Sequence, residues 1–331
     1  MKKIVLTGGG TAGHVTPNIA LLPALQAAGY EIAYVGSYEG IEKKLIADFN
    51  IPYTGISTGK FRRYLDPKNF SDPFRVMKGF VEARNYLKNY QPDVVFSKGG
   101  FVSVPVVRAA ASLHIPCIIH ESDMTPGLAN KLCIPVAEKV CCNFPETMKN
   151  IPADKAVLTG SPIRAELAQG SRLAGLNMCG FTANKPVIMV IGGSLGAANV
   201  NKAVRDALPK LLEDFQVVHL CGKDKIDNLL LNTPGYKQFE YIKSELKDIF
   251  AMADVVISRA GANAICELLA LKKPNILIPL PAASSRGDQL LNAASFEAQG
   301  YSIVLNEDDI TTNLLVDKVH ELYFNRQKYV E

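Results

Sequence analysis

The sequence predicts a doubly wound α/β protein built from two similar halves. Short apolar segments rich in β-branched residues alternate with longer segments of helical periodicity, the pattern of parallel strands covered by helices on both faces. The chain has 331 residues, about two domains' worth. Glycine-rich turns follow strand segments at corresponding places in the two halves, so we expect a ligand-binding edge on each sheet.

The expected strands and helices alternate along the chain. The strand segments are short, mostly apolar and bounded by polar or glycine residues, at 3–7, 31–35, 93–96, 117–119, 187–191, 216–220, 254–257, 275–278 and 301–305. The helical segments repeat apolar residues every three or four positions, at 17–28, 72–89, 102–112, 199–212, 262–271, 288–298 and 311–325. Pro17 suits the first turn of its helix, where a missing N–H costs nothing.

Two motifs recur in the same order. Gly9-Gly10-Thr11-Ala12-Gly13 follows the first strand and Gly192-Gly193-Ser194-Leu195-Gly196 follows the strand at 187–191, and both read G-G-[ST]-x-G. The segment 93–100 likewise matches 254–261. Matched pairs in the same order predict two Rossmann-like halves.

The boundary between the halves is expected at 159–164, where Thr-Gly-Ser-Pro supplies turn chemistry. We therefore predict domains at 1–161 and 162–331. The first half holds more residues between its two motifs than the second, and we place this surplus in 58–80.

Composition excludes several classes of protein. Apolar residues make up 48% and charged residues 21%, which excludes disordered and coiled-coil chains. A formal net charge of +4 does not by itself indicate a nucleic-acid partner. The seven cysteines include no C-x-x-C pair, so free buried thiols in a reducing compartment are expected.

Other signals are also missing from the sequence. The amino-terminal segment turns polar too early for a signal peptide, and no uncharged apolar run reaches the roughly 18 residues of a transmembrane helix. There is no G-x-x-x-x-G-K-[ST], and neither main glycine turn is G-x-G-x-x-G in its usual setting, which disfavours P-loop enzymes and nicotinamide sites.

The first half offers two catalytic candidates. The amides of a strand-to-helix glycine turn suit a diphosphate, because the helix dipole adds positive charge there. His14 directly follows the turn and could act as a general base, although a histidine can also merely cap or fill a turn. The pair His120-Glu121 ends the strand at 117–119 and is a second candidate, with structural hydrogen bonding as its alternative.

In the second half, the segment Arg259–Glu267 crosses from a strand into a helix. Its turn amides would meet phosphate, and Glu267 could reach a ribose diol; without the turn it would be an ordinary exposed glutamate. Asp288-Gln289 follows another strand and could hold sugar hydroxyls. A polar helix start would explain Asp288 but not Gln289.

Residues 60–88 are unusually basic and aromatic. Their net charge exceeds the +4 of the whole chain, and they hold six aromatic residues. Phe74, Met77 and Val81 share a helix face flanked by Arg75 and Lys78, which suits an anionic bilayer. A helix that packs this face into its own domain is an equal alternative. Nucleic acid is a weaker one, because no binding module accompanies the charge.

Six motifs, taken together and in order, resemble the MurG family, the peptidoglycan glycosyltransferases of glycosyltransferase family 28. They are Gly9–Pro17, His120-Glu121, Gly127–Lys131, Thr159–Arg164, Gly192–Ala197 and Ala253–Glu267. The resemblance covers nearly the whole chain. It implies the type B glycosyltransferase fold, with two Rossmann-like domains facing a central cleft.

The resemblance implies inverting transfer of N-acetylglucosamine from UDP-N-acetylglucosamine to the C4 hydroxyl of undecaprenyl-diphosphate-linked N-acetylmuramoyl-pentapeptide, which converts lipid I to lipid II in cell wall synthesis. The acceptor would bind 1–161, which would also face the membrane, and the UDP-sugar donor 162–331. His14 is the leading base candidate and Glu121 the second.

The resemblance also implies a set of substrate-binding residues. Ser194 and 262–264 would hold phosphate, Glu267 the ribose, and the Ile242 backbone the uracil. Gln289 would hold the sugar, and Arg164 would add a donor contact from the hinge. The implied substrate-binding residues are Thr11, Ala12, Gly13, Arg164, Ser194, Ile242, Ala262, Asn263, Ala264, Ile265, Cys266, Glu267 and Gln289. Family members often have Asn where this chain has Asp123.

No metal or cofactor is expected, because helix-terminus amides can stabilise the leaving group and no clear Asp-x-Asp motif is present. The expected partners are the donor, the lipid acceptor and an anionic membrane surface, and not nucleic acid. The protein would be peripheral on the cytoplasmic face of the cell membrane. The alternatives are a type B glycosyltransferase with another lipid or aglycone acceptor, a UDP-sugar epimerase, a non-catalytic nucleotide-sugar-binding protein and an unassigned Rossmann protein.

Overall fold

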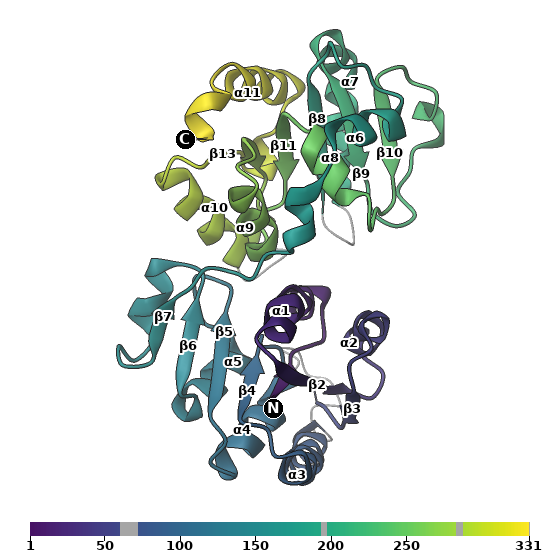
Figure 1. The fold of residues 1–331 in the computed structure, drawn as a ribbon. Coiled ribbons are helices and arrows are strands. Elements are labelled where there is room, and N and C mark those ends of the chain that lie inside the picture. Colours follow the sequence, from purple (N-terminus) through teal and green to yellow (C-terminus); the bar gives the residue numbers. More distant parts are fainter. Residues whose placement is uncertain (60–71, 193–196, 283–286, 331) are drawn as a thin grey trace. The chain divides into compact units, whose positions relative to one another are not determined.

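The computed structural model describes residues 1–59, 72–192, 197–282 and 287–330. The chain divides into two compact units, Met1–Arg164 and Ala165–Glu331 (Figure 1). Each unit is a parallel sheet with helices on its faces, as the sequence predicts.

The described part of the first unit contains a seven-stranded sheet in the order β3-β2-β1-β4-β5-β6-β7. Its strands are β1 (Lys2–Thr7), β2 (Tyr30–Ser37), β3 (Tyr53–Ile56), β4 (Val94–Ser97), β5 (Cys117–Glu121), β6 (Lys139–Cys142) and β7 (Ala156–Leu158). Its helices are α1 (Thr16–Ala27), α2 (Ile41–Ile46), α3 (Asp72–Tyr90), α4 (Ser103–Ser112) and α5 (Leu128–Cys133), with short 3-10 turns η1 (Ala12–His14), η2 (Ala47–Phe49), η4 (Ile134–Val136) and η5 (Pro145–Asn150).

The described part of the second unit contains a six-stranded sheet in the order β10-β9-β8-β11-β12-β13. Its strands are β8 (Val187–Ile191), β9 (Gln216–Leu220), β10 (Tyr236–Phe239), β11 (Val255–Ser258), β12 (Asn275–Leu277) and β13 (Ser302–Val304). Its helices are α6 (Arg172–Cys179), α7 (Ala198–Asp214), α8 (Leu246–Met252), α9 (Ala262–Ala270), α10 (Asp288–Ala298) and α11 (Thr312–Phe324), with 3-10 turns η6 (Ala165–Gln169), η7 (Asn228–Leu230), η9 (Glu307–Asp309) and η10 (Arg326–Tyr329).

The two sheets share one topology, which confirms the repeat predicted from the motifs. Reading β8 as the counterpart of β1 makes the strand orders identical over six strands. In the first unit Thr7 pairs with Ser97, and in the second Ile191 pairs with Ser258. In both units, therefore, the first and fourth strands of the repeat end side by side at the carboxyl edge of the sheet.

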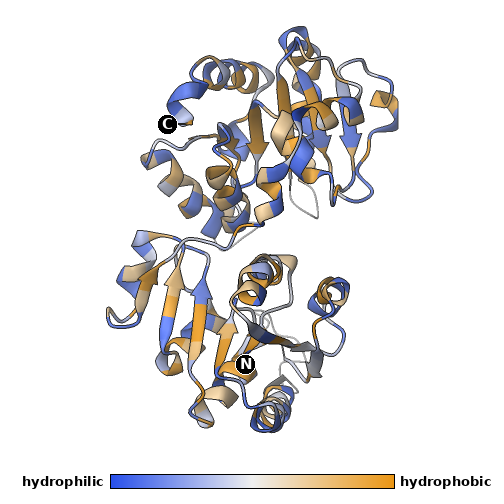
Figure 2. Ribbon diagram, viewed as in Figure 1, coloured by the Kyte–Doolittle hydropathy of each residue, from blue (hydrophilic) through white to orange (hydrophobic). Residues whose placement is uncertain are grey.

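Each sheet is buried between helical layers, and the strands are the most apolar part of each unit (Figure 2). Along β1, Val5 faces a cluster that includes Ala83 of α3 and Val106 of α4. Its neighbour Leu6 faces the opposite cluster, with α1 and α2. In the second unit α7 and α11 cover one face through residues such as Val204 and Leu315. All seven cysteines are free, and five of them are buried.

The sequence missed the shorter or more polar elements. These are β3, β6, β7, β10, α2, α5, α6 and α8. Two of the three residues of β7 are exposed, so it lacks the apolar pattern of a central strand. The helices α2 and α5 have six residues each, too few for a periodic signal. None of the described helices is long and apolar enough to cross a membrane.

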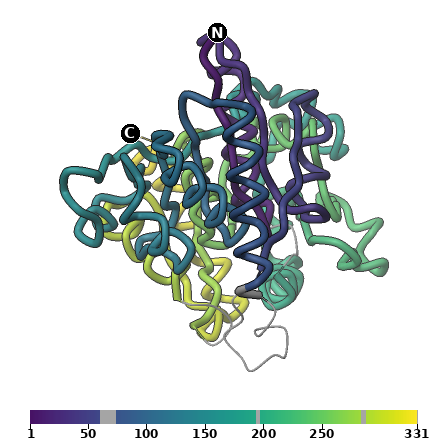
Figure 3. Tube along the Cα trace, turned by 90° about the horizontal axis from the view of Figure 1, so that it is seen from below, coloured from purple at the N-terminus to yellow at the C-terminus, as the bar shows by residue number. Residues whose placement is uncertain are grey.

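Helix α3 carries part of the extra length of the first unit. It has 19 residues, whereas α8, which precedes the corresponding strand of the second unit, has seven. It lies beside α4 on one face of the first sheet (Figure 3). Residues 60–71, which hold the rest of the basic aromatic segment, lie outside the described residues.

Candidate functional site

The carboxyl edge of the first sheet has two glycine turns in contact. The chain leaves β1 through Gly8–Gly10, and Gly10 has a φ of 85°. It leaves β4 through Gly99 and Gly100, with φ values of 91° and 82°. A Cβ on Gly100 would lie 2.3 Å from the carbonyl oxygen of Gly9, so no side chain fits where the two turns meet. Backbone groups therefore line this edge.

His14 lies at the end of η1, directly after the first turn, and its side chain is half-buried. Its Nδ1 is 3.1 Å from the backbone carbonyl oxygen of Lys98. A carbonyl can only accept, so Nδ1 carries the proton of this hydrogen bond and Nε2 keeps the lone pair in the neutral ring. The turn after β4 thus fixes the tautomer that a general base needs.

His120, at the end of β5, is buried and neutral. Lys98 Nζ donates to its Nδ1 at 3.0 Å, and its Nε2 then donates to the carbonyl oxygen of Gly160 at 2.9 Å. Burial, and then the neighbouring Lys98 ammonium, lowers the pKa of His120 to about 3. The ring therefore links β4 to the chain after β7 and is not placed to exchange protons near neutral pH.

Glu121 is 4% exposed and braces the loop after β5. Its carboxylate accepts hydrogen bonds from the amides of Asp123 and Gly127, both at 3.0 Å, and from Asn130 Nδ2 at 2.8 Å. Gly127 is the N-cap residue of α5, so the carboxylate also satisfies a donor at that helix start. Both carboxylate oxygens of Glu121 thus accept hydrogen bonds within this loop, which favours His14 over Glu121 as the candidate base.

Two buried charged groups of the first unit were missed by sequence reasoning. Lys98 is 1% exposed and donates to Ser122 Oγ as well as to His120. Glu42 is fully buried on α2 and accepts from the amides of Gly10 at 3.1 Å and Ser37 at 2.9 Å. Lys98 belongs to the repeated motif, and the basic residue Arg259 at the corresponding position could have marked Lys98 as a functional residue. Glu42 lies on a helix too short to predict and left no signal.

Arg259 holds the corresponding place in the second unit. It directly follows β11, and its Nη1 donates to the carbonyl oxygens of Ile278 at 3.1 Å and Pro279 at 3.2 Å, after the next strand. Its guanidinium also forms an ion pair with Glu307, and both side chains are nearly buried. In each sheet, a buried or nearly buried cation thus directly follows the fourth strand of the repeat.

The predicted phosphate turn of the second unit starts α9. Gly261 is the N-cap residue, and no side chain caps the helix there. Asn292 Nδ2 of α10 donates to the carbonyl oxygen of Ala260 at 3.3 Å and steadies this turn. The first amides of α9 at Ala262, Asn263 and Ala264 form the kind of helix start that binds anions.

The other predicted donor residues lie on or near this edge. Glu267 is in the middle of α9, and its neighbour Ile265 is fully buried, so Ile265 can offer only backbone. Gln289 of α10 accepts the Leu280 amide through Oε1 at 3.0 Å. Ile242, 5% exposed, follows β10.

Three further predicted positions remain. Arg164 is the last residue of the first unit, and Cys266 is half-buried on α9. Ser194 and most of its turn lie outside the described residues. Across the described ranges, no group of three or more His, Cys, Asp or Glu side chains could hold a metal ion.

Comparison with known proteins follows the same division of the chain. Residues 4–142 match the glycosyltransferase family 28 N-terminal domain, and residues 187–331 match its C-terminal domain. Similar curated proteins of Lachnospira eligens and Lachnoclostridium phytofermentans are 66% and 65% identical, each over 100% of this chain and 93% of the relative. Both are named UDP-N-acetylglucosamine--N-acetylmuramyl-(pentapeptide) pyrophosphoryl-undecaprenol N-acetylglucosamine transferase.

A solved structure is similar over the same length. The crystal structure of MurG from Acinetobacter baumannii superimposes with a TM-score of 0.76 and is 29% identical. The match covers 99% of this chain and 92% of that one.

Proposed function

The chain belongs to glycosyltransferase family 28, and we infer that it catalyses the reaction for which its relatives are named. It transfers N-acetylglucosamine from UDP-N-acetylglucosamine to the lipid-linked N-acetylmuramoyl-pentapeptide and so makes lipid II for peptidoglycan. The observation that carries this function is 66% identity over the whole chain to a protein with that activity in its name. Nothing found supports another acceptor or a non-catalytic role.

We propose that the first unit binds the acceptor and the second binds the donor. In the second unit, the first amides of α9 suit the UDP diphosphate, and they could stabilise the charge that develops as UDP leaves. Glu267 would bind the ribose hydroxyls. Because Gln289 Oε1 is held by the Leu280 amide, Gln289 would offer its donor end to the sugar.

In the proposed mechanism, His14 is the general base. Its Nε2 takes the proton of the C4 hydroxyl while the hydroxyl oxygen attacks the anomeric carbon. The bond from that carbon to the UDP oxygen breaks on the opposite side, so the configuration inverts and UDP leaves with the bonding electron pair. Lys98, through its carbonyl, keeps Nδ1 protonated, and Glu121 holds the loop after β5 in place.

We further propose that α3 brings the protein to an anionic membrane surface. Phe74, Met77 and Val81 are 79%, 63% and 49% exposed, so this face is not packed into the domain. Their spacing puts them on one side of the helix, and Arg75 and Lys78 flank them. A peripheral enzyme with such a helix can reach an acceptor whose polyprenyl chain stays in the bilayer.

The transfer itself can be tested with radiolabelled UDP-N-acetylglucosamine and a short-chain analogue of the muramoyl lipid. The proposed function requires label to move into the lipid phase only when enzyme and acceptor are both present. Label that stays in water-soluble products with every muramoyl acceptor would refute it.

A further inference from the structure

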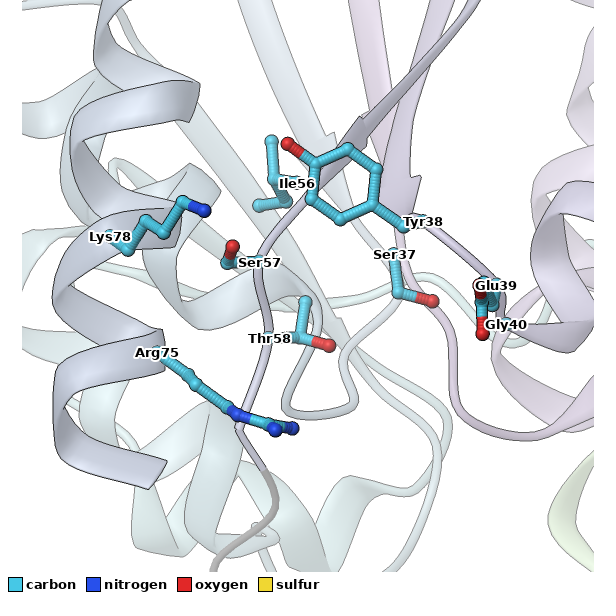
Figure 4. Close-up of a pocket in the computed structure, with 9 residues that line it drawn as sticks. All are labelled: Ser37, Tyr38, Glu39, Gly40, Ile56, Ser57, Thr58, Arg75 and Lys78. Atoms are coloured by element: carbon cyan, nitrogen blue, oxygen red, sulfur yellow. The ribbon is translucent and has the colours of Figure 1, made fainter. Parts of the chain in front are cut away.

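A pocket opens in the first unit at the carboxyl edge of its sheet. It has a volume of about 550 Å³, within the usual range of roughly 300–1,000 Å³ for small-ligand sites. It is lined where β2 and β3 end and by one side of α3 (Figure 4). We call it the α3 pocket; its residues are Ser37, Tyr38, Glu39, Gly40, Ile56, Ser57, Thr58, Arg75 and Lys78.

The walls of the α3 pocket are held in place by Glu82, one turn beyond Lys78 on α3. Its carboxylate accepts the Ser57 amide at 2.6 Å and the Tyr38 hydroxyl at 3.1 Å. Burial raises the pKa of Glu82, but these hydrogen bonds outweigh it and the pKa is lowered overall, so the carboxylate stays charged. At Gly79 a Cβ would lie 1.9 Å from the Ser57 carbonyl oxygen, so the chain after β3 lies directly against α3.

The pocket presents charges of both signs. Figure 4 shows Arg75 and Lys78 directed from α3 toward the chain after β3, with Glu39 on the opposite side. Lys78 Nζ is 3.7 Å from a Glu82 carboxylate oxygen, which offsets part of its charge. Among the residues whose side chains the structure describes, no acidic group forms an ion pair with Arg75.

One buried side chain ties the α3 pocket to the catalytic edge. The Glu42 carboxylate accepts the Gly10 amide of the first glycine turn and the Ser37 amide of the pocket wall. It also accepts the Ser37 hydroxyl. The first glycine turn and the pocket wall are therefore bridged by the two oxygens of one buried carboxylate.

We propose that the α3 pocket binds the peptide branch of the acceptor, with Arg75 paired to a peptide carboxylate. This inference rests on the proposed function. The muramoyl sugar carries its peptide at C3, next to the reacting C4 hydroxyl, so the peptide must leave the reaction centre within a sugar's width. A guanidinium opposite a carboxylate suits a peptide, which carries charges of both signs, better than a phosphate, which Glu39 would repel.

The test compares acceptors with and without the peptide, using short-chain analogues in the absence of vesicles. One acceptor bears the full pentapeptide, and the other ends in a methylamide on the lactyl group. Arg75→Gln should raise KM for the pentapeptide acceptor about tenfold and leave kcat, the KM of the capped acceptor and the donor KM unchanged. Arg75→Lys should raise the KM for the pentapeptide acceptor by a smaller factor. Arg108→Gln, which removes an exposed arginine of α4 outside the pocket, should change none of these constants.

Other outcomes would overturn the proposal. An equal rise in KM for both acceptors would mean that Arg75 acts on the shared part of the substrate. Unchanged KM values would refute the peptide site even if the variant bound anionic vesicles more weakly, because Arg75 also flanks the exposed face of α3. If the wild-type protein transfers sugar to neither acceptor, the proposed function fails first; if it transfers to both and Arg75→Gln has no effect, only the peptide site fails.

Discussion

The imidazole Nδ1 of His14 lies 3.1 Å from the backbone carbonyl oxygen of Lys98, 84 residues away in the sequence. This contact joins the turns after β1 and β4, which are adjacent inner strands of the first sheet. It leaves Nε2 as the one basic ring atom, and it does so through backbone, which no side-chain substitution at position 98 can remove. This geometry supports the proposal that His14 is a preorganised base.

Replacing His14 should therefore affect chemistry more than binding. His14→Ala should lower kcat by roughly 10²–10⁴-fold, the usual contribution of a positioned general base, with little change in the donor KM. Steady-state kinetics with a short-chain acceptor gives both constants. Turnover near that of the wild type would remove His14 from the role of base and return Glu121 or solvent to consideration.

Donor binding should depend on Glu267. Glu267→Ala should weaken UDP binding by roughly 1.5–3 kcal/mol, because a charged acceptor loses its hydrogen bonds to the ribose. Isothermal titration calorimetry measures this directly. Glu297→Ala, which alters an exposed glutamate of α10, is the matched control and should bind UDP normally. Equal UDP affinity in the two variants would exclude Glu267 from the donor site.

The exposed face of α3 predicts membrane binding that is separable from stability. The double variant Phe74→Ser and Met77→Ser should reduce binding to anionic vesicles without lowering Tm, since both side chains already contact solvent. Wild-type binding should weaken but persist at high salt, because salt screens only the charged part. Leu87→Ala on the buried face should instead lower Tm, at a cost of about 2–5 kcal/mol.

Vesicle co-sedimentation beside thermal melts distinguishes these cases. Absence of wild-type binding at low salt would refute the membrane proposal and leave the transferase assignment intact.

The sequence alone predicted the two parallel-sheet units and the positions of the glycine turns along the chain. Strands buried on both faces and the repeated motifs carry strong local signals, so the two sheets and their turns could be predicted. Amphipathicity could not tell whether the Phe74, Met77 and Val81 face was core or surface, because both need the same spacing; the exposure in the structure decides it.

Contacts between distant residues were beyond reach of the sequence. Glu121 reads as a catalytic carboxylate in its motif, yet its hydrogen bonds to the Gly127 amide and Asn130 give it a bracing role that only tertiary structure reveals. Glu42 is a buried bracing carboxylate that the sequence did not reveal at all. Its helix has no periodic signal, and its partners at Gly10 and Ser37 come from two separate strand ends.

Buried His219 should make the second unit sensitive to acid. Its ring contacts Tyr236 OH and Asn201 Oδ1, both at 2.9 Å, and burial lowers its pKa from 6.5 to about 3. Between these two pKa values the unfolded chain binds more protons, so the stability present above pH 6.5 is lost as pH falls. From pH 7 to 5 this one group should cost about 2 kcal/mol.

Urea unfolding of wild type and His219→Gln at the two pH values isolates this effect, since His120 and the carboxylates titrate in both proteins. The variant should lose about 2 kcal/mol less unfolding free energy than the wild type on acidification. An identical loss in the two proteins would mean that His219 does not carry the acid sensitivity.

Sugar transfer with inversion at the anomeric carbon is tested most directly by NMR of the lipid product with parallel quantitation of UDP. We expect one N-acetylglucosamine per acceptor in a β(1→4) linkage, formed from the α-linked donor, and one UDP released for each sugar transferred. Retention of the α configuration would contradict the single-base mechanism. UDP or an epimerised sugar formed without any glycosylated lipid would contradict the transferase assignment itself.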